Sequence, residues 1–199
     1  PTIVWIHGGA FIAGNKSDVA GYLRILAGRG FTVVGAGYSL APGARYPTPV
    51  LQVNELLGFL ARNADRFSVD PTRFFLAGDS AGAQIAAQLA VAVSNPSYAA
   101  ALGVSPAVER EQLRGLILFC GIYDAEQIKH KGKFIGVIET ALWAYLGERD
   151  FADDPRLAEF SIGRHLTPQF PPAFISVGND DQLAPQSVML ADALRAQHV

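Results

Sequence analysis

Short apolar runs alternate along this chain with longer segments in which apolar residues recur at helical spacing. The runs lack regular polar alternation, which is typical of strands buried on both faces of a sheet. They cover residues 3–6, 31–38, 74–77, 113–120 and 173–177. The helical segments cover residues 16–29, 49–66, 84–93, 134–146 and 185–197. This alternation predicts an α/β fold of three layers, α/β/α, with a mostly parallel sheet in the middle.

One segment breaks the alternation of strands and helices. Between residues 125 and 165 the chain carries a broad apolar stripe at helical spacing, which leaves Trp143 off the main apolar face. Two interpretations stay open: one more core helix, or a helical lid whose apolar side covers a substrate pocket. We expect a single domain over residues 1–199, with a lid insertion over residues 125–165.

Composition narrows the classes of partner. With 199 residues, 50% of them hydrophobic, the chain can build one domain around a large core. A net charge of -2 and a pI of about 6.1 offer no basic surface for nucleic acid or an anionic membrane. No apolar stretch approaches the roughly 18 residues that a membrane span needs. The single cysteine, Cys120, excludes an internal disulfide and lies in an apolar run, as a core residue would.

The first residues point to a piece of a longer protein. Pro1 and Thr2 lead directly into an apolar run, with no initiator methionine and no signal-peptide pattern. We therefore expect the fold to be incomplete at both ends. Any targeting segment would lie upstream, so the compartment stays open, with the cytoplasm as the default expectation.

The strongest chemical signal is the pentapeptide GDSAG at residues 78–82, which fits G-x-S-x-G. An apolar run precedes it and an alanine-rich helical segment follows, so the serine lies at a strand-to-helix turn. Such a turn is so sharp that side chains two residues either side of the serine would collide, and glycine is needed at both places. The sequence therefore predicts that Ser80 stands alone at the tip of the turn, as a nucleophile does.

A second signal follows the first apolar run, where the chain reads His7-Gly8-Gly9-Ala10. Backbone N–H groups that side chains do not obstruct can converge on an oxygen that becomes negative in a transition state. An ordinary Gly-Gly turn explains the same letters equally well.

A serine hydroxyl needs a base, usually histidine, and a carboxylate that orients this base. Parallel strands end at a common edge of their sheet, so carboxylates that follow strands are candidates for the orienting group. Asp124, Asp180 and Asp181 meet this criterion.

Taken together, four motifs resemble those of the hormone-sensitive-lipase-like carboxylesterases of the α/β-hydrolase fold. They occur in the family's order and at compatible spacing, and they extend over nearly the whole chain. They are HGGA at residues 7–10, YSLAP at 38–42, GDSAG at 78–82 and G-x-x-D-x-L at 178–183.

The resemblance implies a role for several of these residues. Ser80 would be the nucleophile and Asp181 the acid of a catalytic triad, while His7 would orient its loop without carrying protons. Asp124 and Asp180 become less favoured as the acid. The backbone donors of the oxyanion hole would come from Gly8, Gly9, Ala10 and Ala81. Ala10 stands where the family often has a third glycine, which leaves open which two loop positions donate.

The histidine of such a triad has no obvious position in this sequence. In the family the chain order is serine, acid, histidine, and the histidine follows a further strand. His7, His130 and His165 precede Asp181, and His198 follows it without an intervening strand. We expect the base to lie beyond Val199, so that these 199 residues alone are inactive.

The resemblance implies a serine carboxylesterase that cleaves small to medium acyl esters through an acyl-enzyme, with a small-molecule ester as its partner. It implies no metal and no cofactor. Two alternatives stay open: a non-catalytic protein of the same fold that binds small molecules, and an amidase or peptidase with the same triad. The sequence does not indicate an oligomeric state.

Overall fold

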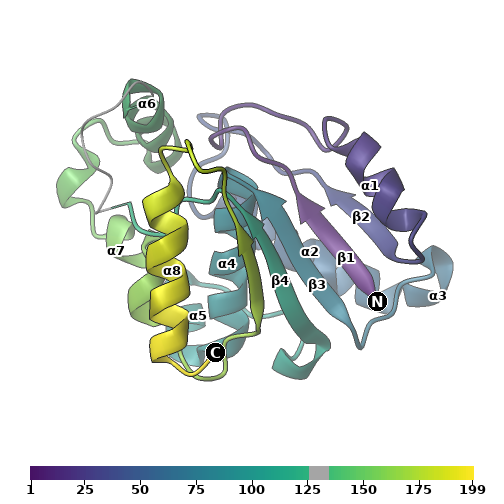
Figure 1. Ribbon diagram of the computed structural model, residues 1–199. Helices are drawn as coiled ribbons and strands as arrows, with labels where there is room; N and C mark the ends of the chain where they lie inside the picture. Colours follow the sequence, from purple (N-terminus) through teal and green to yellow (C-terminus); the bar gives the residue numbers. More distant parts are fainter. Residues whose placement is uncertain (126–134) are drawn as a thin grey trace.

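The computed structural model describes residues 1–125 and 135–199 of the chain. Within these residues the centre is a five-stranded sheet in the order β2-β1-β3-β4-β5, with all neighbouring strands parallel (Figure 1). The strands are β1 (Thr2–Ile6), β2 (Thr32–Ala36), β3 (Phe74–Asp79), β4 (Leu113–Phe119) and β5 (Ala173–Ser176). The predicted α/β architecture with a parallel sheet is confirmed.

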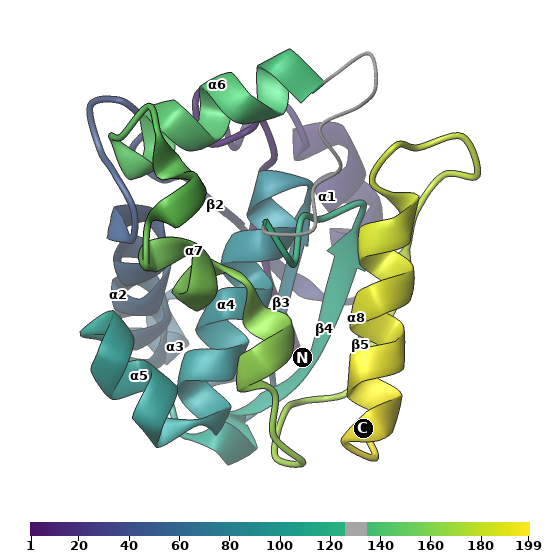
Figure 2. The ribbon, with the colours of Figure 1, turned by 90° about the vertical axis from the view of Figure 1, so that its left-hand side faces the viewer.

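Helices lie on both faces of this sheet. α1 covers one face, whereas α2, α4, α5, α7 and α8 lie on the other (Figures 1 and 2). The α-helices are α1 (Ala20–Ala27), α2 (Thr48–Arg62), α3 (Ala64–Phe67), α4 (Ala81–Ser94), α5 (Pro96–Leu102), α6 (Ile135–Leu146), α7 (Arg156–Phe160) and α8 (Ala184–Ala196). Short 3-10 helices are η1 (Arg110–Gln112), η2 (Phe151–Asp153) and η3 (Ile162–His165).

The two faces of the sheet carry cores of different size. The large core lies between the sheet and the helices around α4. The small core consists of Ile3, Trp5 and Ala77, against which α1 packs. Farther along this second face Phe174 on β5 is 62% exposed. Helices therefore cover the second face only in part.

α4 lies at the centre of the large core, in contact with β1, β3 and β4. Nearly all of its residues are buried, including the polar Gln84 and Gln88. Gln88 donates to the hydroxyls of Tyr46 and Tyr98, at 2.6 and 2.8 Å, and Gln84 donates to the Phe160 carbonyl at 3.1 Å. These hydrogen bonds offset part of the cost of burying the two amides and fix α4 against α5 and α7, although the Gln84 side-chain oxygen has no partner among the described residues.

The boundaries of two predicted helices differ from the pattern. The predicted helix 16–29 begins only at Ala20, because Asn15 and Asp18 hold the preceding residues in a turn. The Asn15 N–H donates to the Asp18 carboxylate at 2.8 Å, and the Ser17 N–H donates to the Asn15 side chain at 3.0 Å. The predicted helix 49–66 is divided at Asn63 into α2 and α3.

α5 has no counterpart among the predicted helices. It begins at Pro96, directly after Asn95, whose side chain accepts the N–H of Tyr98 at 3.2 Å. This is an ordinary helix start, with a capping side chain followed by proline.

The segment between β4 and β5 crosses the end of the sheet at which the strands terminate. α6 lies across this end in both views (Figures 1 and 2). Part of the expected lid, 125–165, lies outside the described residues. This part is 126–134, and it includes His130. Trp143 is 45% exposed on α6, in agreement with its position off the apolar stripe. Among the described helices, none is long and apolar enough to cross a membrane.

Candidate active site

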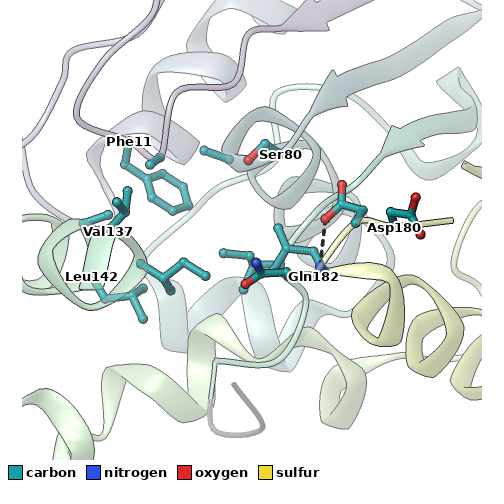
Figure 3. A pocket seen from close by; sticks show the side chains of 13 residues that line it. Phe11, Ser80, Val137, Leu142, Asp180 and Gln182 are labelled. Atoms are coloured by element: carbon teal, nitrogen blue, oxygen red, sulfur yellow. Dashed lines mark hydrogen bonds between the residues drawn. The ribbon is translucent and has the colours of Figure 1, made fainter. Parts of the chain in front are cut away.

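The serine of the 78–82 motif lies at the junction of β3 and α4. Ser80 has φ 50° and ψ -117°, and such a sparsely populated conformation costs about 1–3 kcal/mol. Its N–H donates to the Phe119 carbonyl at 2.8 Å, and its carbonyl accepts the N–H of Gln84 at 3.1 Å. The sheet and the helix therefore hold the strained turn, and Ser80 lines a cavity (Figure 3).

Both glycines of the motif are required by close backbone packing. A Cβ added to Gly78 would lie 2.5 Å from the carbonyl carbon of Gly82 and 2.7 Å from the Ile6 carbonyl oxygen. A Cβ added to Gly82 would lie 2.0 Å from the same Ile6 oxygen. The turn thus brings the start of α4 against the end of β1, which places Ser80 beside the loop that follows β1.

The loop after β1 has an unusual backbone conformation. Gly9, Ala10 and Phe11 all have positive φ, at 112°, 53° and 65°. The Gly9 carbonyl accepts the N–H groups of Ile12 and Ala13, at 3.1 and 2.9 Å, which closes a tight turn. Two side-chain-bearing residues in the left-handed region store strain, so other contacts must hold this loop.

His7 contributes to holding the loop. Its ring stacks on the ring of Tyr38, with centroids 4.3 Å apart, and its Nδ1 lies 2.7 Å from the Gly8 carbonyl. The Tyr38 hydroxyl donates to the His7 carbonyl at 3.1 Å. Burial, and to a smaller extent the Asp79 carboxylate, raise the pKa of Tyr38, so this hydroxyl keeps its proton at neutral pH. His7 is 3% exposed and its ring does not line the cavity.

The four backbone N–H groups predicted for an oxyanion hole fall into two classes. The Gly8 N–H donates to the Asp79 carboxylate at 3.1 Å and is therefore occupied. Within residues 1–125 and 135–199, no protein acceptor is found for the N–H groups of Gly9, Ala10 and Ala81. Ala10 and Ala81 also line the cavity beside Ser80. Ala81 begins α4, whose N-terminal dipole favours negative charge at this place.

The cavity has a volume of about 330 Å³ and is mostly apolar. Figure 3 shows Phe11, Val137 and Leu142 along one side and Asp180 at the other, with Ser80 between them. Ser80, Asp180, Asp181 and Gln182 are its polar lining residues; the others are Ala10, Phe11, Ala81, Ile122, Val137, Ile138, Ala141, Leu142 and Leu183. α6 contributes a large part of the apolar wall.

Asp181 lies in the turn after β5, at the same edge of the sheet as Ser80. Its N–H donates to the Gly178 carbonyl at 3.1 Å, and its carboxylate accepts the N–H of Leu183 at 2.8 Å. Asp181 is half-buried, whereas its neighbour Asp180 is exposed. Both carboxylates line the cavity, and that of Asp181 is the one held by a backbone hydrogen bond.

None of the histidines that the structure describes lines the cavity. The Nε2 of His165 lies 2.8 Å from the Ala158 carbonyl. His198 is exposed just beyond the C-terminal end of α8, whereas Asp181 precedes the other end of this helix. A helix of that length spans about 20 Å, so α8 keeps His198 far from Asp181. Figure 1 shows the C-terminus at the end of α8 that is remote from α6.

Cys120 is a second possible nucleophile near the turn at Ser80. It follows β4 and has φ 44°. The sequence predicts a core residue here, but Cys120 is only half-buried. Burial raises the pKa of its thiol, and nearby Asp181 and Asp79 raise it further, whereas a backbone hydrogen bond with Ser80 opposes the shift. The thiol therefore stays protonated at neutral pH, and Ser80 is the better candidate.

Asp79 received no role from the sequence, although it belongs to the GDSAG motif. One of its carboxylate oxygens accepts the indole N–H of Trp5, and the other accepts the N–H of Gly8, both at 3.1 Å.

In the described ranges, no three side chains of His, Cys, Asp or Glu come together as metal ligands would.

Comparison with known proteins supports the fold described above. A family model described as alpha/beta hydrolase fold matches residues 3–199. The acetyl esterase of Salmonella paratyphi B is 28% identical over 204 residues, which cover 98% of this chain and 59% of that protein.

Among solved structures, Esterase B of Lactobacillus rhamnosis has a TM-score of 0.84 at 25% identity, covering all of this chain and 62% of that one. A second structure of this esterase, described with a tributyrin phosphonate inhibitor, has a TM-score of 0.82, the same identity and the same coverage. The chain thus spans about three fifths of the length of these relatives.

Proposed function

Because the chain belongs to the alpha/beta hydrolase fold family, we propose that it carries the nucleophile of a serine hydrolase that cleaves carboxylic esters. The observation that carries the proposal is the strained turn at Ser80, which faces a cavity also lined by Ala10 and Ala81. Their unpartnered N–H groups lie on two separate segments, as the two sides of an oxyanion hole require. The esterase relatives support this assignment.

The proposed reaction begins with attack of the Ser80 hydroxyl oxygen on the ester carbonyl carbon, while a base takes the hydroxyl proton. The carbonyl oxygen becomes negative and accepts hydrogen bonds from the Ala81 N–H and from the N–H of Gly9 or Ala10. The carbon–oxygen bond to the alcohol then breaks, and the base returns the proton to the departing alkoxide. Water next attacks the acyl-serine by the same steps and releases the acid.

Asp181 is proposed as the carboxylate that orients the base and stabilises its positive charge. Since no described histidine lines the cavity, we propose that the base is a histidine of the polypeptide beyond Val199. Gly8 contributes to the oxyanion hole indirectly in this proposal, because its N–H is held by Asp79.

The apolar wall formed by α6 suits the acyl group of the substrate. A volume of about 330 Å³ lies at the small end of the range of ligand sites, which favours short to medium acyl chains. The tributyrin phosphonate described with the Lactobacillus esterase carries four-carbon acyl groups, which supports the same size class.

The test compares Ser80→Ala with the exposed Ser97→Ala in the full-length polypeptide. We expect the wild type and Ser97→Ala to hydrolyse p-nitrophenyl butyrate with an initial burst and to bind a fluorophosphonate probe covalently. Ser80→Ala should lose turnover, burst and labelling together. Retained activity in Ser80→Ala would refute the nucleophile. A wild type that binds the ester without turnover would favour the non-catalytic binding protein.

A further inference from the structure

We propose that Asp79 is a positioning residue that fixes the loop after β1 relative to the Ser80 turn. The inference rests on the proposed ester hydrolysis. Asp79 is the last residue of β3, directly before Ser80, and it accepts one hydrogen bond from Trp5 and one from Gly8, each at 3.1 Å. Its side chain is not among those that line the cavity.

Because of its position in the chain, Asp79 can connect the two segments that carry the proposed oxyanion donors. Gly8 is directly followed by Gly9 and Ala10, and Asp79 is directly followed by Ser80 and Ala81. The bond from Gly8 to Asp79 therefore joins the two segments that carry the proposed oxyanion donors. The fit at this joint is close, since a Cβ on Gly8 would lie 2.4 Å from the Asp79 carboxylate oxygen.

The loop needs such an attachment because its backbone is strained. Three consecutive residues from Gly9 to Phe11 have positive φ, and without an anchor they would relax. An oxyanion hole acts through donors held within a few tenths of an ångström of the developing charge, so relaxation lowers the rate of chemistry more than substrate affinity.

The second hydrogen bond holds Asp79 itself in place. Trp5 is 2% exposed, and its ring makes T-shaped contacts with the rings of Tyr22 and Phe119, at centroid distances of 5.1 and 5.4 Å. Phe119 also accepts the N–H of Ser80. Trp5, Asp79, Ser80 and Phe119 thus form a closed ring of contacts around the turn.

A carboxylate is the side chain that this arrangement requires. Both of its neighbours are N–H donors, and only an ionised carboxylate of this length offers an acceptor to each. In Asp79→Asn one acceptor is replaced by an amide NH₂, so one donor faces another donor. Removing the indole donor as well, in Asp79→Asn with Trp5→Phe, leaves the asparagine oxygen free to accept the Gly8 N–H.

Because each donor is matched to one acceptor, removing a donor should rescue the loss of an acceptor. The rescue experiment uses the full-length polypeptide with p-nitrophenyl butyrate as substrate. We expect Asp79→Asn to lower kcat about 10- to 100-fold with KM changed less than about threefold. The double variant Asp79→Asn with Trp5→Phe should recover most of this loss in kcat. Asp192→Asn, an exposed carboxylate on α8, is the matched control and should leave kcat unchanged.

Hydrogen–deuterium exchange over residues 7–11 provides a readout that does not depend on activity. Asp79→Asn should accelerate exchange in this loop and the double variant should slow it again. An inactive wild type would refute the ester hydrolysis, and the exchange data would still decide whether Asp79 anchors the loop.

Unchanged kcat and exchange in Asp79→Asn would overturn the proposal, and so would a loss that Trp5→Phe fails to rescue. Should Asp79→Asn not fold, the double variant is compared with Trp5→Phe alone. If the kcat of the double variant lies within about threefold of that of Trp5→Phe, the proposal is supported, and a larger loss overturns it.

Discussion

The ring of Phe11 lies parallel to the ring of Tyr145, with centroids 4.1 Å apart and planes inclined by 4°. Both residues are almost fully buried, and the N–H of Tyr46 donates to the Tyr145 carbonyl at 2.8 Å. This stack joins α6 to the loop that carries the proposed oxyanion donors. The helix that forms the cavity wall is therefore packed directly against that loop.

The stack leads to a prediction about Tyr145. Burial raises the pKa of its hydroxyl, and within the described residues this oxygen has no hydrogen-bond partner. Tyr145→Phe keeps the stack and removes an unpaired polar atom, so it should raise the free energy of unfolding by about 1 kcal/mol. Tyr145→Leu should lower it by at least about 1 kcal/mol. Chemical denaturation measures both, and a destabilised Tyr145→Phe would contradict the assignment of an unpaired hydroxyl.

The two neighbouring carboxylates after β5 should differ strongly in importance. Asp181→Asn should lower kcat about 10³- to 10⁴-fold, because an amide orients the wrong form of the base. Asp180→Asn, on the exposed neighbour, should stay within about threefold of the wild type. Steady-state kinetics with p-nitrophenyl butyrate in the full-length polypeptide compare them. The reverse pattern would assign the acid to Asp180.

The contact between Gly82 and β1 predicts a large loss of stability on substitution. In Gly82→Ala the new methyl group would lie 2.0 Å from the Ile6 carbonyl oxygen, so β1 and α4 must separate. We expect the free energy of unfolding to fall by about 3 kcal/mol or more. Gly21→Ala, in α1 with no atom within 4 Å of the added carbon, should instead raise it by about 0.5 kcal/mol. If Gly82→Ala and Gly21→Ala changed the thermal stability equally, the close packing of Gly82 against β1 would be absent.

Leu142 should influence the acyl-chain preference. It lines the cavity from α6, and Leu142→Ala creates space for a longer chain. Each further methylene that becomes buried should add about 0.8 kcal/mol, or about fourfold, to kcat/KM. A series of p-nitrophenyl esters from acetate to octanoate measures the shift, below the melting temperature of the variant. Trp143→Ala, on the exposed side of α6, should leave the profile unchanged. If Leu142→Ala kept the chain-length profile of the wild type, the wall formed by α6 would be excluded as the acyl site.

The turn at Ser80 could be predicted from the sequence because its determinants are local. The two glycines, the preceding apolar run and the following alanine-rich segment all lie within about twenty residues. The same holds for the parallel sheet, whose apolar runs are contiguous. α5 could also have been found, since Asn95 followed by Pro96 is a helix-start signal.

The role of Asp79 could not be predicted, because its partners Gly8 and Trp5 lie 71 and 74 residues away in the sequence. No local pattern shows which donors a strand-end carboxylate will meet. The stack of Phe11 on Tyr145 depends in the same way on the path of the chain. It forms only when α6 folds back over the end of the sheet.

The placement of α6 separates two properties of the site. Ser80 and Asp79 stand on the sheet and its central helix, whereas Val137, Ile138 and Ala141 reach the cavity from a helix outside the sheet. A combinatorial library at these three positions would change the shape of the cavity while the turn that carries the proposed nucleophile stays constant. Under the proposed function, substrate selectivity can therefore evolve, or be engineered, without changing the residues that carry the reaction.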